Sequence, residues 1–282
     1  MISKQLDGTM RGVAPRLAVV ALSVILAALA TGCNGDEPPT PDPVDDTASA
    51  ALYFLRDGTI APVRREIAAS AEPEQAALAA LLEGPTVDEA MGDLATAIPA
   101  GTKLLDLSID DGIATVDLDG TFDDGGGSAS MQGRVAQVVA TLTRFPSVMK
   151  VAFRLDGEPV EAIGGEGVVV DPPIGRLEIE DQTPQILIES PLPGDTVTSP
   201  VRLRGTANVF EANVSIEAKD ETGTVILEAF TTATSGTGTR GTFDTKLNLP
   251  TASGTITIVT FEASAEDGRP LHVRDVQVTV AP

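Results

Sequence analysis

The residues best suited to acid–base or metal chemistry form one acidic stretch in the first half of the chain. This stretch holds six aspartates, namely Asp110, Asp111, Asp117, Asp119, Asp123 and Asp124. Two carboxylates flanking a sugar bond can act as the acid and the base of a glycoside hydrolase, and converging carboxylates can bind calcium. A calcium loop of the EF-hand type starting at Asp117 would need glycine at the position of Phe122. We therefore predict solvated turns and no metal, and keep a carboxylate-based hydrolase as the alternative hypothesis.

A second motif is the glycine-rich segment near residue 240. Gly236, Gly238 and Gly241 match the G-x-G-x-x-G spacing with which a turn and a helix N-terminus hold a pyrophosphate. The residues after Gly241 have the pattern of a strand, so we predict a hairpin or intersheet loop and no cofactor. Arg240 in this loop is expected to pair with an acidic neighbour or to bind a partner carboxylate.

Composition excludes several classes of function. His272 and Cys33 are the only histidine and cysteine, which argues against zinc sites and against Cys/His or Ser/His/Asp catalysis. Aromatic residues make up 3% of the chain, too few for a platform that stacks bases or sugars. The net charge of −22 repels phosphate backbones. We predict that the protein is not an enzyme and has no nucleic-acid partner.

The N-terminal residues predict export and a lipid anchor. Basic residues precede residues 17–30, a run of small and aliphatic side chains without a charge. At about 1.5 Å per residue this run is too short for a bilayer core of roughly 30 Å, but it fits a secretory signal. The run ends in Ala-Thr-Gly-Cys33, which resembles the lipobox of bacterial lipoproteins. The resemblance implies that residues 1–32 are a signal peptide, that Cys33 is acylated, and that the protein is held at the extracytoplasmic face of the cell membrane.

The chain after the anchor begins with a spacer and a mixed domain. Residues 33–49 are rich in proline and acidic residues, which predicts a disordered spacer. Residues 50–165 combine apolar alternation with helical periodicity, which predicts an α+β domain with helices packed on a small sheet. The expected elements are strands at 51–55 and 59–67, a helix at 73–83, a hairpin at 105–118 with Leu105, Leu107 and Ile109 on one face, a helix at 128–145 and a strand at 148–155.

The last third of the chain has a different pattern. Residues 166–183 contain Pro172-Pro173 and predict a linker. Residues 184–282 contain seven β-rich runs separated by turn residues, which predicts an all-β immunoglobulin-like sandwich. Its core is expected to consist of Val, Ile and Leu together with the four phenylalanines Phe210, Phe230, Phe243 and Phe261.

Several short segments of the sequence resemble those of a known family. The first domain resembles the GerMN domain of bacterial spore germination and sporulation lipoproteins in residues 81–86 (LLEGPT), 97–102 (AIPAGT), 114–118 (ATVDL) and 141–146 (TLTRFP). The second resembles the immunoglobulin-like module that accompanies GerMN, in residues 205–212 (GTANVFEA) and 236–243 (GTGTRGTF). Asp119 and Arg144 depart from the family pattern, which usually has Ser and Gln there.

The resemblance implies a surface lipoprotein whose first domain is similar to the ring-building domains of sporulation assemblies, without established catalytic residues. We therefore expect a non-enzymatic binding or assembly module of the cell envelope, with an envelope protein or the cell wall as partner and self-association of the first domain. A peptidoglycan hydrolase that uses carboxylates of this domain is the alternative. The candidate partner-binding residues are Arg64, Asp117 and Arg240. For Arg64, as for its neighbour Arg65, intradomain ion pairs are the favoured interpretation and an anionic ligand is the alternative.

Overall fold

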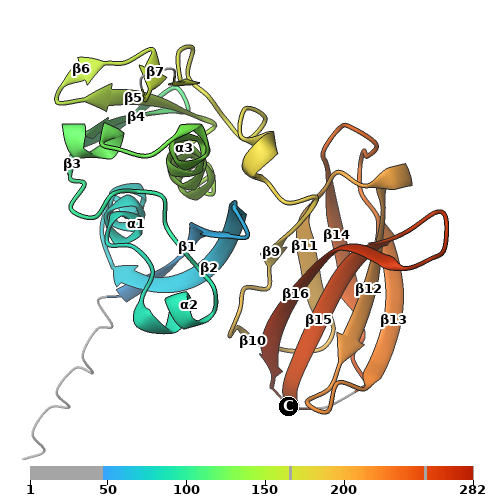
Figure 1. Ribbon diagram of the computed structural model, residues 1–282. Coiled ribbons are helices and arrows are strands. Elements are labelled where there is room, and N and C mark those ends of the chain that lie inside the picture. Colours follow the sequence, from blue (N-terminus) through green and yellow to red (C-terminus); the bar gives the residue numbers. More distant parts are fainter. Residues whose placement is uncertain (1–46, 165–166, 251–252, 282) are drawn as a thin grey trace, which may run out of the picture. The chain divides into compact units, whose positions relative to one another are not determined.

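The computed structural model describes residues 47–164, 167–250 and 253–281, which belong to one compact unit (Figure 1). The predicted signal peptide, Cys33 and most of the predicted spacer lie outside these residues. Strand β1, Thr47–Arg56, already includes residues 47–49, which the sequence assigns to the spacer. They are ordered because each pairs with a residue near the end of strand β2.

The first layer of the N-terminal domain is the long antiparallel hairpin of β1 and β2, Thr59–Ala68. Its turn is Asp57-Gly58, with φ of 52° and 76°, a left-handed conformation that glycine adopts freely and aspartate tolerates. Helix α1, Pro73–Leu82, starts with proline in its first turn and buries Ala77, Leu78 and Leu81. The short helix α2, Val87–Met91, is capped by Thr86 and Glu89 in a capping box.

The second layer is a sheet with the strand order β3-β4-β5-β6. These strands are Leu104–Asp110, Ile113–Leu118, Lys150–Leu155 and Glu158–Pro159. Strands β4 and β5 are parallel, so the chain between them must cross over, and it does so through the 3-10 turn η1, Gly120–Asp123, and helix α3, Ser128–Leu142. A small hairpin of β7, Ala162–Ile163, and β8, Val168–Val169, follows.

Helix α3 lies between the two layers (Figure 1). Its apolar side chains at helical spacing, Met131, Val135, Val138, Val139 and Leu142, are all buried. The helix ends at Leu142 and not at Phe145 as expected, because the amides of Arg144 and Phe145 bond to carbonyls three residues back, in a tight turn that leads into Pro146. The prediction of an α+β domain is confirmed.

The C-terminal domain consists of two facing sheets. Their strand orders are β10-β16-β15-β12-β13 and β14-β11-β9. The strands are β9 (Ile186–Ser190), β10 (Thr196–Val197), β11 (Val201–Ala207), β12 (Asn213–Lys219), β13 (Val225–Thr232), β14 (Gly241–Leu247), β15 (Gly254–Ala263) and β16 (Pro270–Val280), with the 3-10 turns η2 (Glu180–Gln182) and η3 (Phe210–Ala212). All seven predicted runs are strands, and the immunoglobulin-like prediction is confirmed.

The residues expected to link the domains are themselves packed. Ile174 and Ile179 are buried in the core of the N-terminal domain, together with Leu187 of β9. Ile174 also forms a two-way backbone bridge with Val151 of β5. The segment 167–183 is therefore held against the first domain over much of its length.

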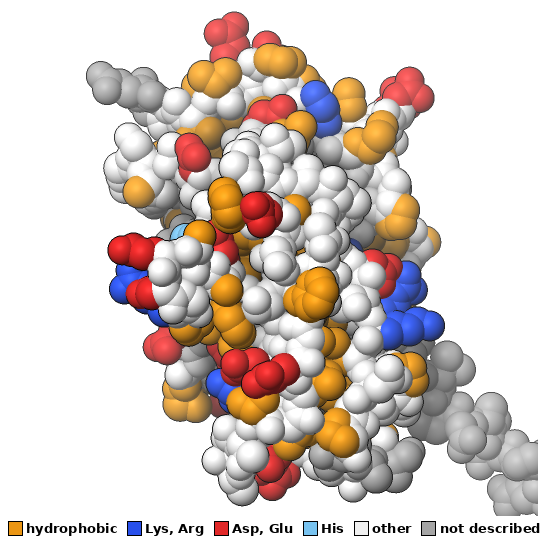
Figure 2. Space-filling model, turned by 90° about the vertical axis from the view of Figure 1, so that its right-hand side faces the viewer, with side chains coloured by type: hydrophobic (Ala, Val, Ile, Leu, Met, Phe, Trp, Pro, Cys, Tyr) orange, Lys and Arg blue, Asp and Glu red, His pale blue; other side chains and the backbone are white. Residues whose placement is uncertain are grey.

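The expected aromatic core of the second domain is partly wrong. Phe243 is buried, but Phe210 and Phe230 are 50% and 71% exposed. Phe230 lies opposite Ser215, which points outward because its neighbours Val214 and Ile216 fill the sandwich. Figure 2 shows hydrophobic side chains exposed over the face it presents, with acidic side chains among them.

The apolar face expected for the hairpin of β3 and β4 is also partly wrong, because Leu105 and Ile109 are both exposed, Ile109 at 37%. Leu105 is 51% exposed, since the register of β3 shifts between Leu104 and Asp106. A bulge of this kind removes one residue from the alternation.

The G-x-G-x-x-G segment is explained by backbone packing. A Cβ on Gly236 would lie 2.5 Å from the Val209 carbonyl oxygen, and one on Gly241 would lie 2.3 Å from the Ser235 nitrogen. Gly238 has a φ of 96°. Strand β14 starts at Gly241, so no helix follows the motif.

Candidate functional site

The structure brings two of the three predicted partner-binding residues to the same place. Arg64 on β2 and Arg240 beside β14 both lie at the junction between the N-terminal and C-terminal domains, where they bind residues 180–195. Asp117 lies elsewhere, on β4.

Asp117 and the neighbouring carboxylates serve separate turns. The Asp117 carboxylate accepts a hydrogen bond from the Gly157 amide at 3.0 Å, Asp119 accepts one from the Lys103 amide, and Asp123 accepts one from the Gly164 amide. Throughout the described residues, no three His, Cys, Asp or Glu side chains form a group that could hold a metal ion. The geometry of this region is that of turn stabilisation.

The acidic neighbour of Arg240 is Glu180. The guanidinium, 10% exposed, donates to both carboxylate oxygens of Glu180 at 2.6 and 3.0 Å, and to the Pro184 carbonyl at 2.9 Å. Burial raises the pKa of Glu180, but hydrogen bonds from Arg240 and Asn208 outweigh it and hold this pKa below its usual range. Arg240 thus fastens the segment before β9 to the C-terminal domain.

Arg64 forms its ion pair across the junction and not within its own domain. Its Nε and Nη2 donate to the two carboxylate oxygens of Asp195 at 2.5 and 2.9 Å, and its Nη1 donates to the Ser49 hydroxyl at 2.6 Å. Burial raises the pKa of Asp195, but the hydrogen bonds from Arg64 and the Leu192 amide outweigh it, so this pKa lies below its usual range. The intradomain pair expected here belongs to Arg65, which binds Glu89.

The centre of the junction is Glu189, a residue that no pattern in the sequence had indicated. One oxygen of this carboxylate accepts hydrogen bonds from the Tyr53 hydroxyl at 3.1 Å and from Arg176 at 3.3 Å, while Arg144 lies 3.9 Å from the other. Burial raises the pKa of Tyr53, and Arg176, 4.8 Å above its ring, opposes this rise. Arg144 had one signal in the sequence, its departure from the family pattern. The other residues come from separate elements and had none.

An open hollow lies along this junction. It has a volume of about 370 Å³ and is lined by Ser49, Arg64 and Arg144 from the first domain and Glu189, Ser190 and Arg204 from the second. A neighbouring hollow of about 340 Å³ shares Arg144 and Glu189 and adds Arg176 and Arg240. Guanidinium groups bind carboxylate and phosphate oxygens with paired hydrogen bonds. We call the first of these spaces the junction hollow.

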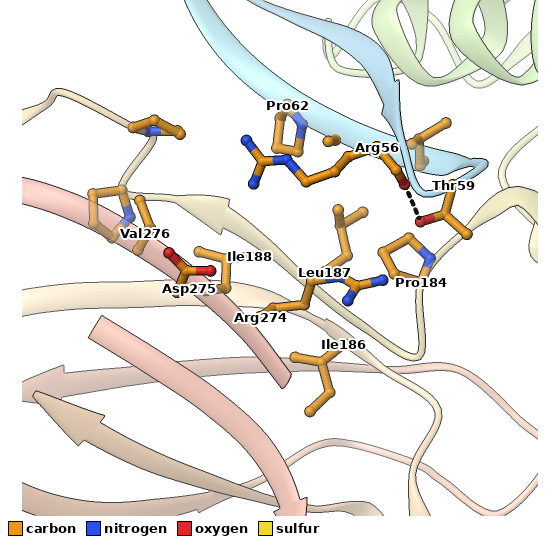
Figure 3. A pocket seen from close by; sticks show the side chains of 14 residues that line it. Arg56, Thr59, Pro62, Pro184, Ile186, Leu187, Ile188, Arg274, Asp275 and Val276 are labelled. Atoms are coloured by element: carbon orange, nitrogen blue, oxygen red, sulfur yellow. Dashed lines mark hydrogen bonds between the residues drawn. The ribbon is translucent and has the colours of Figure 1, made fainter. Parts of the chain in front are cut away.

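A second, apolar crevice also lies at the junction (Figure 3). It holds about 50 Å³ between the turn of the β1–β2 hairpin, the start of β9 and Arg274–Val276 of β16. Thr59 donates to the Arg56 carbonyl at its edge. This space is several times that needed for one water but far below the roughly 300–1,000 Å³ of a cofactor pocket. We therefore regard it as a packing seam.

Comparison with known families identifies both domains. The model described as Germane, sporulation and spore germination, matches residues 51–161, and the model described as Gmad2, an immunoglobulin-like domain of bacterial spore germination, matches residues 185–269. The chain therefore carries a GerMN domain followed by a Gmad2 domain. The family resemblance seen in the sequence is confirmed.

Solved structures similar to this chain include sporulation proteins. The first GerMN domain of the sporulation protein GerM from Bacillus subtilis is 25% identical, covering 46% of this chain and 99% of that chain, with a TM-score of 0.42. The tandem GerMN domains of the same protein are 20% identical, covering 72% and 61%, with a TM-score of 0.43. A protein from Clostridium perfringens classed as a candidate lipoprotein is 26% identical, covering 49% and 93%, with a TM-score of 0.36. The assignment rests on the two family matches and not on these likenesses.

No curated protein is similar enough to this chain to count as a match. Among the described helices, none has the length and apolar character needed to cross a membrane.

Proposed function

We propose that this protein is a lipid-anchored lipoprotein of the cell envelope, whose GerMN and Gmad2 domains act together as a non-enzymatic binding or assembly module. The observation that carries the proposal is the order of its parts, a lipobox-like cysteine at position 33 followed by two domains of spore germination families. The ion pairs of Arg64, Arg176 and Arg240 support a joint role, because they hold the two domains together as one presenting surface.

Cell fractionation tests the anchor. The wild-type chain is expected in the membrane fraction, and Cys33→Ala should move it to the soluble extracytoplasmic fraction, because the only acylation site is gone. A Ser49→Ala chain, which keeps Cys33, is the matched control and should stay with the membrane. Membrane retention of the Cys33→Ala chain would contradict the anchor.

Incubation with purified cell wall separates the binding module from the hydrolase. A binding module should sediment with the wall or with an envelope protein and release no fragments. Fragment release that Asp117→Asn abolishes would establish the hydrolase and overturn the proposal.

The GerMN domain is also proposed to self-associate. Sedimentation of the chain with Cys33→Ser over a wide range of concentration should show assembly that grows with concentration. A monomer at every concentration would remove the assembly role and leave the binding role.

A further inference from the structure

The strongest further feature of the junction is a pair of arginines in the junction hollow whose guanidinium groups have few partners or none among the described residues. The guanidinium groups of Arg64, Arg176 and Arg240 already donate hydrogen bonds to other residues of the chain. Arg144 has only the Glu189 carbonyl at 3.4 Å and the distant Glu189 carboxylate at 3.9 Å. For Arg204, no hydrogen bond or ion pair occurs among the described residues, and its side chain is exposed.

The balance of charge around the hollow is positive. Four guanidinium groups, those of Arg64, Arg144, Arg176 and Arg204, stand with three carboxylates, those of Glu189, Asp195 and Glu66, the last lying opposite Ser49 and acting on Arg64. One positive charge is left in excess in a chain whose net charge is −22. Since charges are largely screened beyond about 8 Å at physiological salt, the local excess governs what binds at contact.

Neighbouring acidic groups do not remove this excess. Asp244 lies across from Arg204 on β14 and attracts it electrostatically, but its two oxygens accept hydrogen bonds from Arg202, at 2.8 and 2.5 Å. On the other side of Arg204 lies Ser190 of β9, for whose hydroxyl no hydrogen bond occurs within the part of the chain that the structure describes. Arg204 is therefore held between two strands, with its guanidinium available to the hollow.

We propose that the junction hollow binds an oxyanion, carboxylate or phosphate, carried on a hydroxyl-bearing envelope polymer, with Arg144 and Arg204 as the two binding groups. The proposal rests on the proposed function, for which it names the chemistry of the partner. Guanidinium supplies parallel N–H donors that fit both kinds of oxyanion, and the Ser49 and Ser190 hydroxyls line the same space. Both domains contribute, so the site exists only when GerMN and Gmad2 are joined.

Calorimetry on the chain from residue 33 onward, with Cys33→Ser, tests the proposal at physiological salt. The probes are trigalacturonate for carboxylate, glycerol 3-phosphate for phosphate, and maltotriose as the neutral control. At least one anionic probe should bind saturably with one site per chain, and maltotriose should not. The anionic probe that binds shows which oxyanion the hollow prefers.

Three variants locate the site. Arg204→Gln and Arg144→Gln should each weaken binding at least about tenfold, as expected for the loss of a charged hydrogen bond. Arg269→Gln is the matched control, because Arg269 is 69% exposed, carries the same charge and lies outside the hollow. It should bind like the parent chain, and Arg204→Gln should unfold at the parent's temperature.

Absence of saturable binding for both anionic probes would overturn the proposal, as would an equal loss in Arg269→Gln. Membrane retention depends on Cys33 and not on Arg204. If no anion binds, the proposal of a lipid-anchored module therefore still stands. If the protein is not anchored, the calorimetric result is unaffected.

Discussion

At the scale of single residues, the GerMN domain depends on a buried arginine that hydrophobic patterning does not reveal. Arg134 on α3 is 3% exposed. Its guanidinium donates to the carbonyl oxygens of Ala97, Phe122 and Gly125, at 3.0, 2.6 and 2.8 Å. Burial lowers the pKa of Arg134, with opposition from nearby aspartates. One side chain thus fixes three loop carbonyls around the helix.

Replacement of this arginine should be costly. Arg134→Met leaves three carbonyls without their donor, and at about 1 kcal/mol each the free energy of unfolding should fall by about 3 kcal/mol. Chemical denaturation measures the change. Arg154→Met on β5, where the side chain is exposed, is the control and should stay within about 0.5 kcal/mol of wild type. An equal fall in the free energy of unfolding of the two variants would show that the carbonyl contacts of Arg134 do not stabilise the fold.

At the scale of elements, α3 has two buried stripes of different character. The apolar stripe packs into the core, and a polar stripe of Arg134, Gln137 and Thr141 fastens other elements to the helix. The Gln137 carbonyl accepts from the Ala97 amide at 2.8 Å, and the Thr141 hydroxyl accepts from the Tyr53 amide at 3.1 Å. The first bond satisfies an amide of the segment between α2 and β3, and the second satisfies an amide of β1 that lies outside the two-stranded pairing, as buried backbone groups require.

In the Gmad2 domain, Gly205 of β11 has no room for a side chain. A Cβ there would lie 2.1 Å from the Leu187 carbonyl oxygen and 2.6 Å from the Phe243 ring. Gly205→Ala should therefore lower the free energy of unfolding by about 2 to 3 kcal/mol, because β9 cannot move without losing its pairing. Gly127→Ala is the control, since nothing lies within 4 Å of its Cβ position, and it should cost less than about 1 kcal/mol. Thermal unfolding compares the two, and a tolerated Gly205→Ala would mean that β9 can shift.

At the scale of the whole molecule, ion pairs and hydrogen bonds join the GerMN and Gmad2 domains, in addition to apolar packing. Tyr53, Arg64 and Arg176 contribute from the N-terminal side, and Glu189 and Asp195 from the C-terminal side. Leu187 of β9 adds an apolar contact to the first core. The junction should therefore weaken when its carboxylates are protonated.

The effect of pH on this junction has a definite sign. The pKa values of Asp195 and Glu180 are lowered on folding, so their contribution to stability is present above the unfolded values near 4 and is lost as pH falls through the folded values. A chain with Asp195→Asn and Glu180→Gln should be less stable than wild type at pH 6 and should approach it as pH falls below about 4. Denaturation at a series of pH values measures the difference. A difference that stays constant down to pH 2.5 would mean that these carboxylates do not stabilise the fold by their charge.

The sequence by itself determined the order of the parts and the type of nearly every element. Turn residues such as Asp57-Gly58 and apolar periods such as that of α3 act locally, so they can be read without knowing what packs against them. The same local reading failed at Phe230 and Leu105, where the direction of a side chain depends on strand register and on a bulge. It also could not find the junction, because Tyr53, Arg144, Glu189 and Arg204 come together only when distant strands pair and the two domains meet. Tertiary structure alone decided which arginines form ion pairs within the chain and which can bind a ligand. The reason is that this depends on the distances between groups that are far apart in the sequence.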